Sequence, residues 1–125
     1  MNENDISYLI RGAIFKVFNK LGPGLLESVY EALLVYELEK LGLSVKRQVP
    51  LPVIHDNVRL EKGYRVDLIV NDLVAVEIKS TKNLEEVHHK QLLTYLKLSG
   101  LKLGILVNFF TSNISKSIYR KVNNL

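Results

Sequence analysis

Apolar residues recur at helical spacing through the first part of the chain, with Asn4 or Asp5 available as an N-terminal cap. This pattern predicts an amphipathic helix that ends at Gly22-Pro23-Gly24. A second helix is predicted from about Leu25 to Leu41, with Gly42 at its C-terminal end. The two segments together predict a helical hairpin. The apolar positions of the first helix are Ile6, Leu9, Ile10, Ala13, Ile14, Val17, Phe18 and Leu21.

After this hairpin the pattern changes to short β-branched runs, which are typical of strands. In the segment from Leu43 to Leu60, Pro50 and Pro52 each remove a backbone donor, so we expect an edge strand there. The pair Asp56-Asn57 predicts a turn. The next segment, Gly63 to Lys79, holds two further apolar runs and predicts two more strands.

The remainder of the chain predicts a third helix, a buried strand and a fourth helix. The third helix is expected from about Leu84 to Ser99, closed by Gly100, and the strand from Leu103 to Phe109. The last helix would begin at Ser112 or Asn113; it would turn Ile114, Ile118 and Val122 inward and Lys116, Arg120 and Lys121 outward. This order of elements favours one α/β (α+β) domain over residues 1–125, with a central mixed sheet flanked by helices.

The composition is that of an ordinary globular domain, with 47% hydrophobic and 24% charged residues among 125. The polar, acidic N-terminus is unlike a targeting signal, and no apolar run reaches membrane-spanning length, so we expect a cytoplasmic protein without membrane contact. The chain has no cysteine, which excludes disulfides and thiolate metal sites.

The net charge of +4 is unevenly distributed along the chain. Residues 1–78 carry 9 Lys and Arg against 11 Asp and Glu, whereas residues 79–125 carry 8 against 2. A basic segment of this kind attracts a polyanion such as nucleic acid. A solvated, lysine-rich surface would have the same composition, so charge alone leaves both interpretations open.

The segment from Gly63 to Lys79 carries charge where a core strand would carry none. Asp67 lies in its first apolar run, and Glu77 and Lys79 lie in its second. A buried carboxylate is costly unless it is paired, hydrogen-bonded or bound to a metal. Two such carboxylates beside a lysine therefore suggest a site.

Whether the two carboxylates meet depends on the turn between the strands. A two-residue loop at Asn71-Asp72 would pair Asp67 with Val76 and leave Glu77 on the opposite face. A three-residue loop that includes Leu73 would pair Asp67 with Glu77 directly. We predict the three-residue loop or an equivalent bulge, because only this register places both carboxylates in one site.

Given that register, Asp67 and Glu77 offer the hard oxygen ligands that Mg²⁺ takes while it keeps several waters. Lys79 could then orient an attacking water or stabilise charge on a phosphate, and Glu27 is the natural third carboxylate. On the third helix, His88, Gln91 and Tyr95 share one stripe from which polar groups could reach a substrate. Each residue taken alone has a simpler explanation as a surface ion pair, a helix-capping charge or a core aromatic.

The combination of these residues resembles the core of the PD-(D/E)XK nuclease superfamily. Asp67 is followed after nine residues by Glu77-Ile78-Lys79, and Gln91-x-x-x-Tyr95 resembles the extension found in RecB-like members. The segment from Gly24 to Tyr30 matches the signature of the GxxExxY family, and Gly63-x-Arg65-x-Asp67 adds to the similarity, which runs from about Leu21 to Phe109. One departure is Val66, which stands where the superfamily is named for a proline.

The resemblance implies a restriction-endonuclease-like core that binds Mg²⁺ or Mn²⁺ at Asp67, Glu77, the Ile78 carbonyl and Glu27. It also implies that Lys79 is the catalytic lysine, acting with Asp67 and Glu77. Substrate contacts would then come from the second and third helices and the approach to Asp67, and contacts to a nucleic-acid backbone from the C-terminal helix. The residues expected to contact the substrate are Gln91, Tyr95, His88, Tyr30 and Arg65. Those expected to contact the nucleic-acid backbone are Lys116, Arg120 and Lys121.

We therefore expect a metal-dependent nuclease that acts on nucleic acid, with DNA favoured over RNA. Because a chain of 125 residues presents little surface to a duplex, a homodimer or a larger protein partner is also expected. Two other hypotheses stay open at this point. One is a non-catalytic module that keeps the fold and binds nucleic acid or a protein, and the other is an internal ion-pair network without a ligand.

Overall fold

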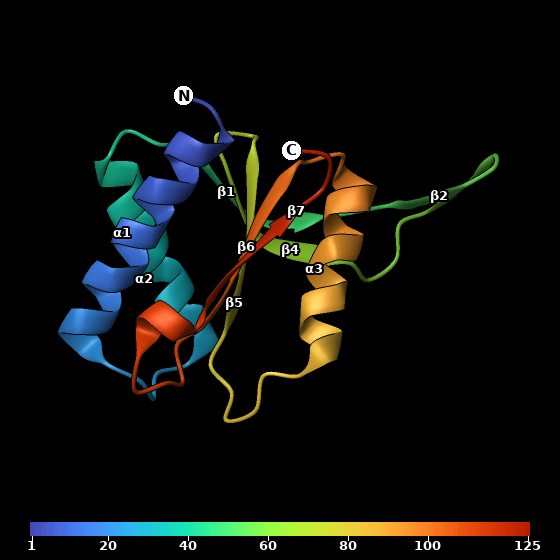
Figure 1. Cartoon of the computed structure of the whole chain (residues 1–125). Coiled ribbons are helices and arrows are strands. Elements are labelled where there is room, and N and C mark those ends of the chain that lie inside the picture. Colours follow the sequence, from blue (N-terminus) through green and yellow to red (C-terminus); the bar gives the residue numbers. More distant parts are fainter.

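A five-stranded mixed sheet lies at the centre of the structure, a computed structural model that describes residues 1–125 (Figure 1). Its strand order is β1-β4-β5-β6-β7, and only the β5–β6 pair is parallel. The helix α3 (Glu86–Ser99) makes the crossover that a parallel pair needs. The five strands are β1 (Val45–Pro50), β4 (Arg65–Val70), β5 (Val74–Lys79), β6 (Leu103–Asn108) and β7 (Ile118–Val122).

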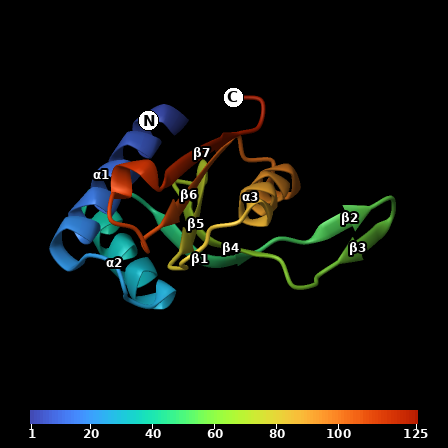
Figure 2. The ribbon, with the colours of Figure 1, turned by 60° about the horizontal axis from the view of Figure 1, so that its bottom comes forward.

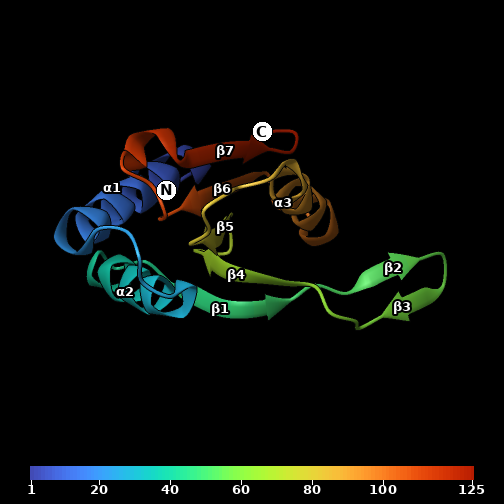
Figure 3. The same ribbon diagram turned by 90° about the horizontal axis from the view of Figure 1, so that it is seen from below.

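Helices cover both faces of this sheet, as the sequence predicts. The hairpin of α1 (Glu3–Leu21) and α2 (Glu27–Lys40) covers one face over a core of 20 buried residues, and α3 covers the other over a core of 8 (Figure 3). The helix α1 begins earlier than expected, because Asn2 is its cap and exchanges two hydrogen bonds with Asp5. None of the helices combines the length and the apolar composition that spanning a bilayer requires.

The hairpin between β4 and β5 has the three-residue loop that the sequence predicts. Its pairs are Leu68 with Val76, Ile69 with Ala75 and Val70 with Val74, so the loop is residues 71–73. Asn71 and Asp72 both have positive φ angles, of 53° and 57°, which polar residues of this type tolerate. The Asn71 side chain also accepts the Ser44 amide at 2.8 Å, which fixes the loop against the start of β1.

Between β1 and β4 the chain forms a separate two-stranded ribbon, β2 (Val53–His55) and β3 (Val58–Leu60). Figures 2 and 3 show this ribbon projecting away from the main sheet. The strand β1 lies at an edge of the main sheet and ends at Pro50, which confirms the expected edge strand.

The C-terminal segment is not the predicted helix. It forms a short 3₁₀ turn, η1 (Ile114–Lys116), and then the strand β7, which pairs antiparallel with the outer edge of β6. Because strand residues alternate between faces, the basic residues of this segment do not share one surface. Arg120 donates to Asn4 of α1, whereas the Lys121 amine lies 6.0 Å from the Tyr119 ring, which itself meets His89 of α3. The predicted C-terminal helix with Lys116, Arg120 and Lys121 on its outer side is therefore wrong, and the role of these residues in binding a nucleic-acid backbone stays a prediction.

Candidate metal centre

The three-residue loop brings Asp67 and Glu77 together on neighbouring strands. The Asp67 backbone N–H donates to Glu77 Oε1 at 2.9 Å, and the Ile78 backbone N–H donates to Asp67 Oδ2 at 2.8 Å. Each carboxylate therefore accepts an amide of the strand that carries the other. These reciprocal hydrogen bonds hold both acids at the end of β5, where the regular pairing with β4 stops.

The neighbouring strand β1 changes conformation at the same level. Gln48 has a positive φ of 47°, between the regular pairs Arg47 with Leu68 and Val49 with Val66. Its amide nitrogen reaches two acids, Asp67 Oδ1 at 3.2 Å and Glu31 Oε1 at 2.6 Å. The unusual backbone at Gln48 thus serves to direct a hydrogen-bond donor toward Asp67.

The helix α2 contributes two acids to this region, Glu27 and Glu31, one turn apart. Glu27 is the first residue of the helix, and its Oε2 accepts the Ser80 backbone N–H at 3.0 Å. The Ser80 hydroxyl donates to the Leu25 carbonyl at 2.8 Å, so the loop after β5 is fixed to the start of α2. A hollow of about 710 Å³ opens here, and its lining includes Glu27, Glu31, Asp67, Gln48, Ser80 and Phe110.

Burial and mutual repulsion make this group of acids unfavourable without a cation. Burial is the main reason that the pKa of Glu77 rises to about 8, and the negative charge of Asp67 adds to it. The pKa of Asp67 is also raised, first by burial and further by the charge of Glu31, although the Ile78 amide and Gln48 oppose the shift. Lys79 lowers the pKa of both acids but does not offset their burial.

The residues present fit a hard divalent ion that keeps much of its water. No three acidic or histidine side chains are grouped tightly enough to enclose a metal by themselves. Mg²⁺ does not require such a cage, because it commonly uses one or two carboxylates and completes its shell with water and substrate phosphate. Asp67 and Glu77 offer such a pair of carboxylates, and they remain predicted ligands, as do the Ile78 carbonyl and Glu27.

Lys79 is the last residue of β5 and differs from its acidic neighbours in its contacts. Its side chain is half-buried and takes part in none of the ion pairs in the structure. Its backbone carbonyl accepts the Phe109 N–H at 2.8 Å, which fixes the start of the side chain. The ammonium group is therefore available to a ligand.

The helix α3 brings Tyr95 close to the acids but uses His88 for its own cap. Burial raises the pKa of the Tyr95 phenol to about 12, and the charges of Glu77 and Asp67 add to the shift, while Gln91 opposes it. His88 Nδ1 accepts the Glu85 backbone N–H at 3.0 Å, which closes the first turn of the helix. Gln91 and Tyr95 thus remain candidates for substrate contact, and the Nδ1 atom of His88 is already occupied.

Tyr30 is a structural residue and not a substrate contact. Its side chain has no exposed surface, and its ring stacks on Phe109 with centroids 4.0 Å apart. Its hydroxyl donates to the Gly22 carbonyl and accepts the Leu25 N–H, so it holds the loop before α2 in place. Arg65, in contrast, is exposed at the start of β4 and forms no ion pair, so its predicted role stays a prediction.

Three residues of this region were not anticipated from the sequence, namely Glu31, Gln48 and Asn108. Asn108 is a buried amide at the end of β6; its oxygen accepts the N–H groups of Thr81 and Phe110, and its nitrogen donates to the Thr81 carbonyl. It thereby joins the loops that follow the two parallel strands. A polar residue at the end of an apolar strand is a signal that sequence inspection could have used, as is the one-turn spacing of Glu31 from Glu27.

The comparisons with known proteins agree with this geometry. The chain matches the family model of the PD-(D/E)XK nuclease superfamily over residues 4–121. It is also similar to a solved structure described as "Crystal structure of SSO0001", with 25% sequence identity and a TM-score of 0.57. That similarity covers 78% of this chain and only 50% of the other, so the chain spans about half the length of that structure.

A search of curated proteins finds no match for this chain. The family assignment therefore depends on the family model, which covers nearly the whole sequence, and on the sheet, helices and charged residues described above. The restriction-endonuclease-like arrangement of a mixed sheet with flanking helices is confirmed. On these grounds, the chain belongs to the PD-(D/E)XK nuclease superfamily.

Proposed function

We propose that this protein is a metal-dependent nuclease of the GxxExxY type, which hydrolyses phosphodiester bonds of nucleic acid and takes DNA as its substrate. The observation that carries the proposal is the pairing of Asp67 with Glu77 beside Lys79, whose ammonium group is free of ion pairs. This set lies at the carboxyl ends of the parallel strands β5 and β6, where α/β sheets bind their ligands.

In this proposal Asp67 and Glu77 hold Mg²⁺ or Mn²⁺, with the Ile78 carbonyl and Glu27 as further ligands directly or through water. The bound ion supplies Lewis-acid stabilisation of the phosphate and a more acidic water. Lys79 positions the attacking water and donates hydrogen bonds to the phosphate oxygens, which gain charge as the phosphorus–oxygen bond breaks. Gln91 and Tyr95 orient the substrate from the side of α3.

The surroundings of the site suit an extended anionic substrate. A second hollow of about 600 Å³ shares Gly24 and Phe110 with the first and is also lined by Lys82, Thr111 and Ser112. Phe110 is 46% exposed and offers a ring to a nucleobase, and Lys82 offers a charge to a phosphate. Asn108 fixes the backbone of Phe110, so this surface is set by the fold.

Calorimetry of Mn²⁺ binding tests the metal site. The Asp67→Asn variant should lose binding, because one of the two ligating carboxylates becomes an amide. The matched control is Asp72→Asn in the same hairpin, since Asp72 is exposed and pairs only with Lys46 at 2.7 Å. This control should bind Mn²⁺ as the wild type does. Equal Mn²⁺ binding by the Asp67→Asn variant would refute the site.

Cleavage of single-stranded DNA, double-stranded DNA and RNA tests the activity. Lys79→Ala should lose at least about 100-fold in rate, as expected when a group that stabilises the transition state is removed. Lys97→Ala, an exposed lysine of α3, is the control and should cleave normally. Cleavage that survives Lys79→Ala would contradict the proposed mechanism.

The alternative is a non-catalytic module that keeps the fold and binds nucleic acid or a protein. The observation that favours it is that both acids already serve the protein, because each accepts a backbone amide without any metal. Normal Mn²⁺ binding together with no cleavage of any of the three substrates would support this alternative.

A further inference from the structure

Gly12 lies at the centre of α1 without an evident reason inside the chain. The residue is exposed, and a Cβ atom placed there would meet no atom within 4 Å. Glycine in a helix interior is unfavourable by roughly 0.5–1 kcal/mol relative to alanine. No contact within this chain requires the absence of a side chain at Gly12. The space that the glycine leaves open is therefore available to another molecule.

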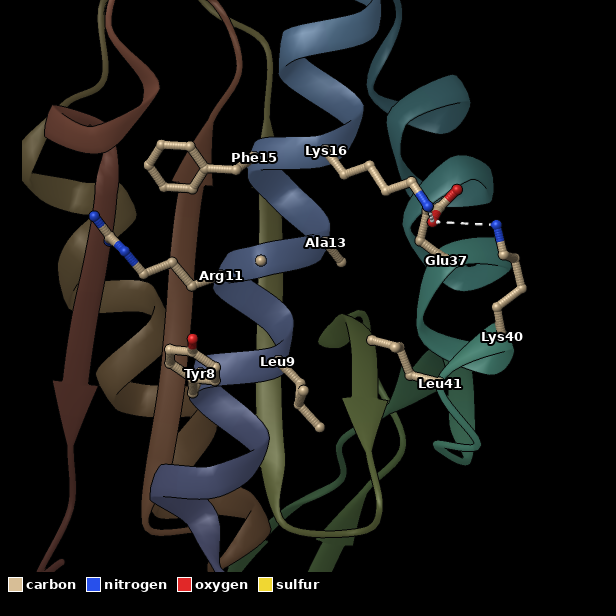
Figure 4. A pocket seen from close by; sticks show the side chains of 10 residues that line it. Tyr8, Leu9, Arg11, Ala13, Phe15, Lys16, Glu37, Lys40 and Leu41 are labelled. Carbon is tan, nitrogen blue, oxygen red and sulfur yellow. Dashed lines mark ion pairs between the residues drawn. The ribbon is translucent and has the colours of Figure 1, made fainter.

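The surface around Gly12 is a groove of about 530 Å³ (Figure 4). Tyr8 and Phe15 flank it on one side of α1, and Leu9 and Leu41 flank it toward the end of α2. Tyr8 is 78% exposed and Leu41 is 50% exposed, so the groove presents apolar surface to solvent. An exposed hollow of this kind is typical of a contact site for another molecule.

The charges of α1 show which partner fits the groove. The first turn of α1 carries Glu3 and Asp5, and its second half carries Lys20 and Lys16, of which Lys16 is already paired with Glu37. Arg11 is a further cation in the groove, beside Gly12. Two copies of this helix packed antiparallel would place the acidic end of each against the basic end of the other. The two helix dipoles would then be antiparallel, which is the favourable arrangement.

We propose that the groove binds α1 of a second copy of this chain, with the two helices crossing at Gly12. Gly12 is the middle residue of the helix Glu3–Leu21, so a two-fold axis through it matches the two helices along their whole length. A residue before Gly12 then lies opposite residues at the same distance after Gly12 in the partner. Tyr8 faces the region of Phe15 and Lys16, and Asp5 faces that of Asn19 and Lys20.

The missing Cβ allows the two helix backbones to approach closely at the crossing point, and the aromatic residues pack on either side of it. Lys16 forms an ion pair with Glu37 at 2.9 Å, so the wall of the groove toward α2 is already ordered. The groove shares no lining residue with the hollow beside Asp67. The candidate metal centre of each copy therefore stays open in the dimer. This proposal does not depend on the proposed nuclease activity.

Sedimentation equilibrium of the full chain tests the interface. The contact is a single helix pair, so the wild type should form a dimer with a Kd of about 1–100 µM. Gly12→Leu should be monomeric at protein concentrations at which the wild type is a dimer, because the leucine side chain occupies the crossing point. Its melting temperature in dilute solution should not fall, since the added atoms meet nothing within the monomer.

The contribution of the aromatic residues is tested with a matched pair of variants. Tyr8→Ala should weaken the dimer at least about 10-fold, equivalent to about 1.4 kcal/mol. Tyr36→Ala removes another exposed tyrosine, which belongs to α2 and does not line the groove, and it should leave the dimer unchanged. A wild-type chain that stays monomeric, or a dimer that is unaffected by Gly12→Leu, would overturn the proposal.

Discussion

Glu77 and Glu37 lie in opposite electrostatic settings within one small protein. Glu37 lies in the groove between α1 and α2, and the Lys16 ammonium, 2.9 Å away, is the main reason that its pKa is lowered. Lys40 is a second cation, 3.7 Å from the same carboxylate. Glu77 is buried beside Asp67, and its pKa rises to about 8.

The difference separates a charge that the fold has already neutralised from one that it has not. The ion pairs of Glu37 satisfy that carboxylate in place, so its charge needs no ligand. The acids at the end of β5 have hydrogen bonds but too little positive charge, so they gain most from an added cation. Charged residues in general are therefore a weak guide to a site, and buried charge without a counter-ion is a stronger one.

The largest expected effect is on the pH dependence of stability through Glu77. Between pH of about 4.5 and 8 the native carboxyl keeps a proton that the unfolded chain has lost, so the free energy of unfolding should fall as the pH rises. The slope should approach about 1.4 kcal/mol per pH unit, the value for a difference of one proton. Glu77→Gln keeps the acceptor for Asp67 and should flatten this slope in urea titrations. An equal slope in both proteins would show that Glu77 does not titrate in this range.

A divalent cation should remove the same pH dependence and stabilise the protein. At 100 times its Kd, Mg²⁺ or Mn²⁺ should add about 3 kcal/mol to the free energy of unfolding, because it binds only the folded chain. The gain should increase with pH as the proton leaves Glu77. Thermal melts at pH 6 and pH 8, with and without the ion, measure it, and Asp67→Asn should show no gain.

A smaller effect is expected at Glu31, which is buried like Glu77 but paired like Glu37. Arg47 Nη2 lies 3.0 Å from Glu31 Oε2, and Gln48 donates to the other oxygen. Arg47→Met should destabilise the fold by about 1–2 kcal/mol, since it leaves a buried carboxylate with one partner fewer. Urea denaturation measures the change. If Arg47→Met leaves the free energy of unfolding unchanged, Gln48 and solvent are sufficient to stabilise the Glu31 carboxylate.

The smallest effect is expected at Glu37, whose pairing with Lys16 and Lys40 is solvent-exposed on the lysine side. Glu37→Gln should leave the melting temperature nearly unchanged, because water and salt screen such pairs. The comparison with Glu77→Gln is made at the same pH and at low and high salt. A large loss of stability in Glu37→Gln would end the contrast between the two settings.

The pairing of Asp67 with Glu77 could be predicted because it depends on local features. Period-two alternation of Val74, Val76 and Ile78 fixes the faces of β5, and loop length then decides which residues of β4 lie opposite. Helices α1 and α3 were predictable for a similar reason, since their apolar residues gather on one face, and a glycine marks the end of each of the three helices.

The C-terminal strand could not be predicted in this way. Ile114, Ile118 and Val122 are spaced by four residues and fit a helix, but β6 offers a free edge that a strand can satisfy. That long-range pairing overrides the local pattern. The contact of Gln48 with Asp67 and Glu31 was also hidden, because the unusual backbone at Gln48 is recognised only when β1 lies beside β4.

The exchange of amides between Asp67 and Glu77 also bears on which substitutions the protein can survive. Selection for folding alone would retain a hydrogen-bond acceptor at both positions, because each side chain holds the backbone of the opposite strand, and an amide can accept these bonds as an acid does. Lys79 has no such partner, so a mutational scan scored only for abundance should accept many residues there. A scan scored for function should reject them, which makes Lys79 the most informative position for telling an enzyme from an inherited scaffold.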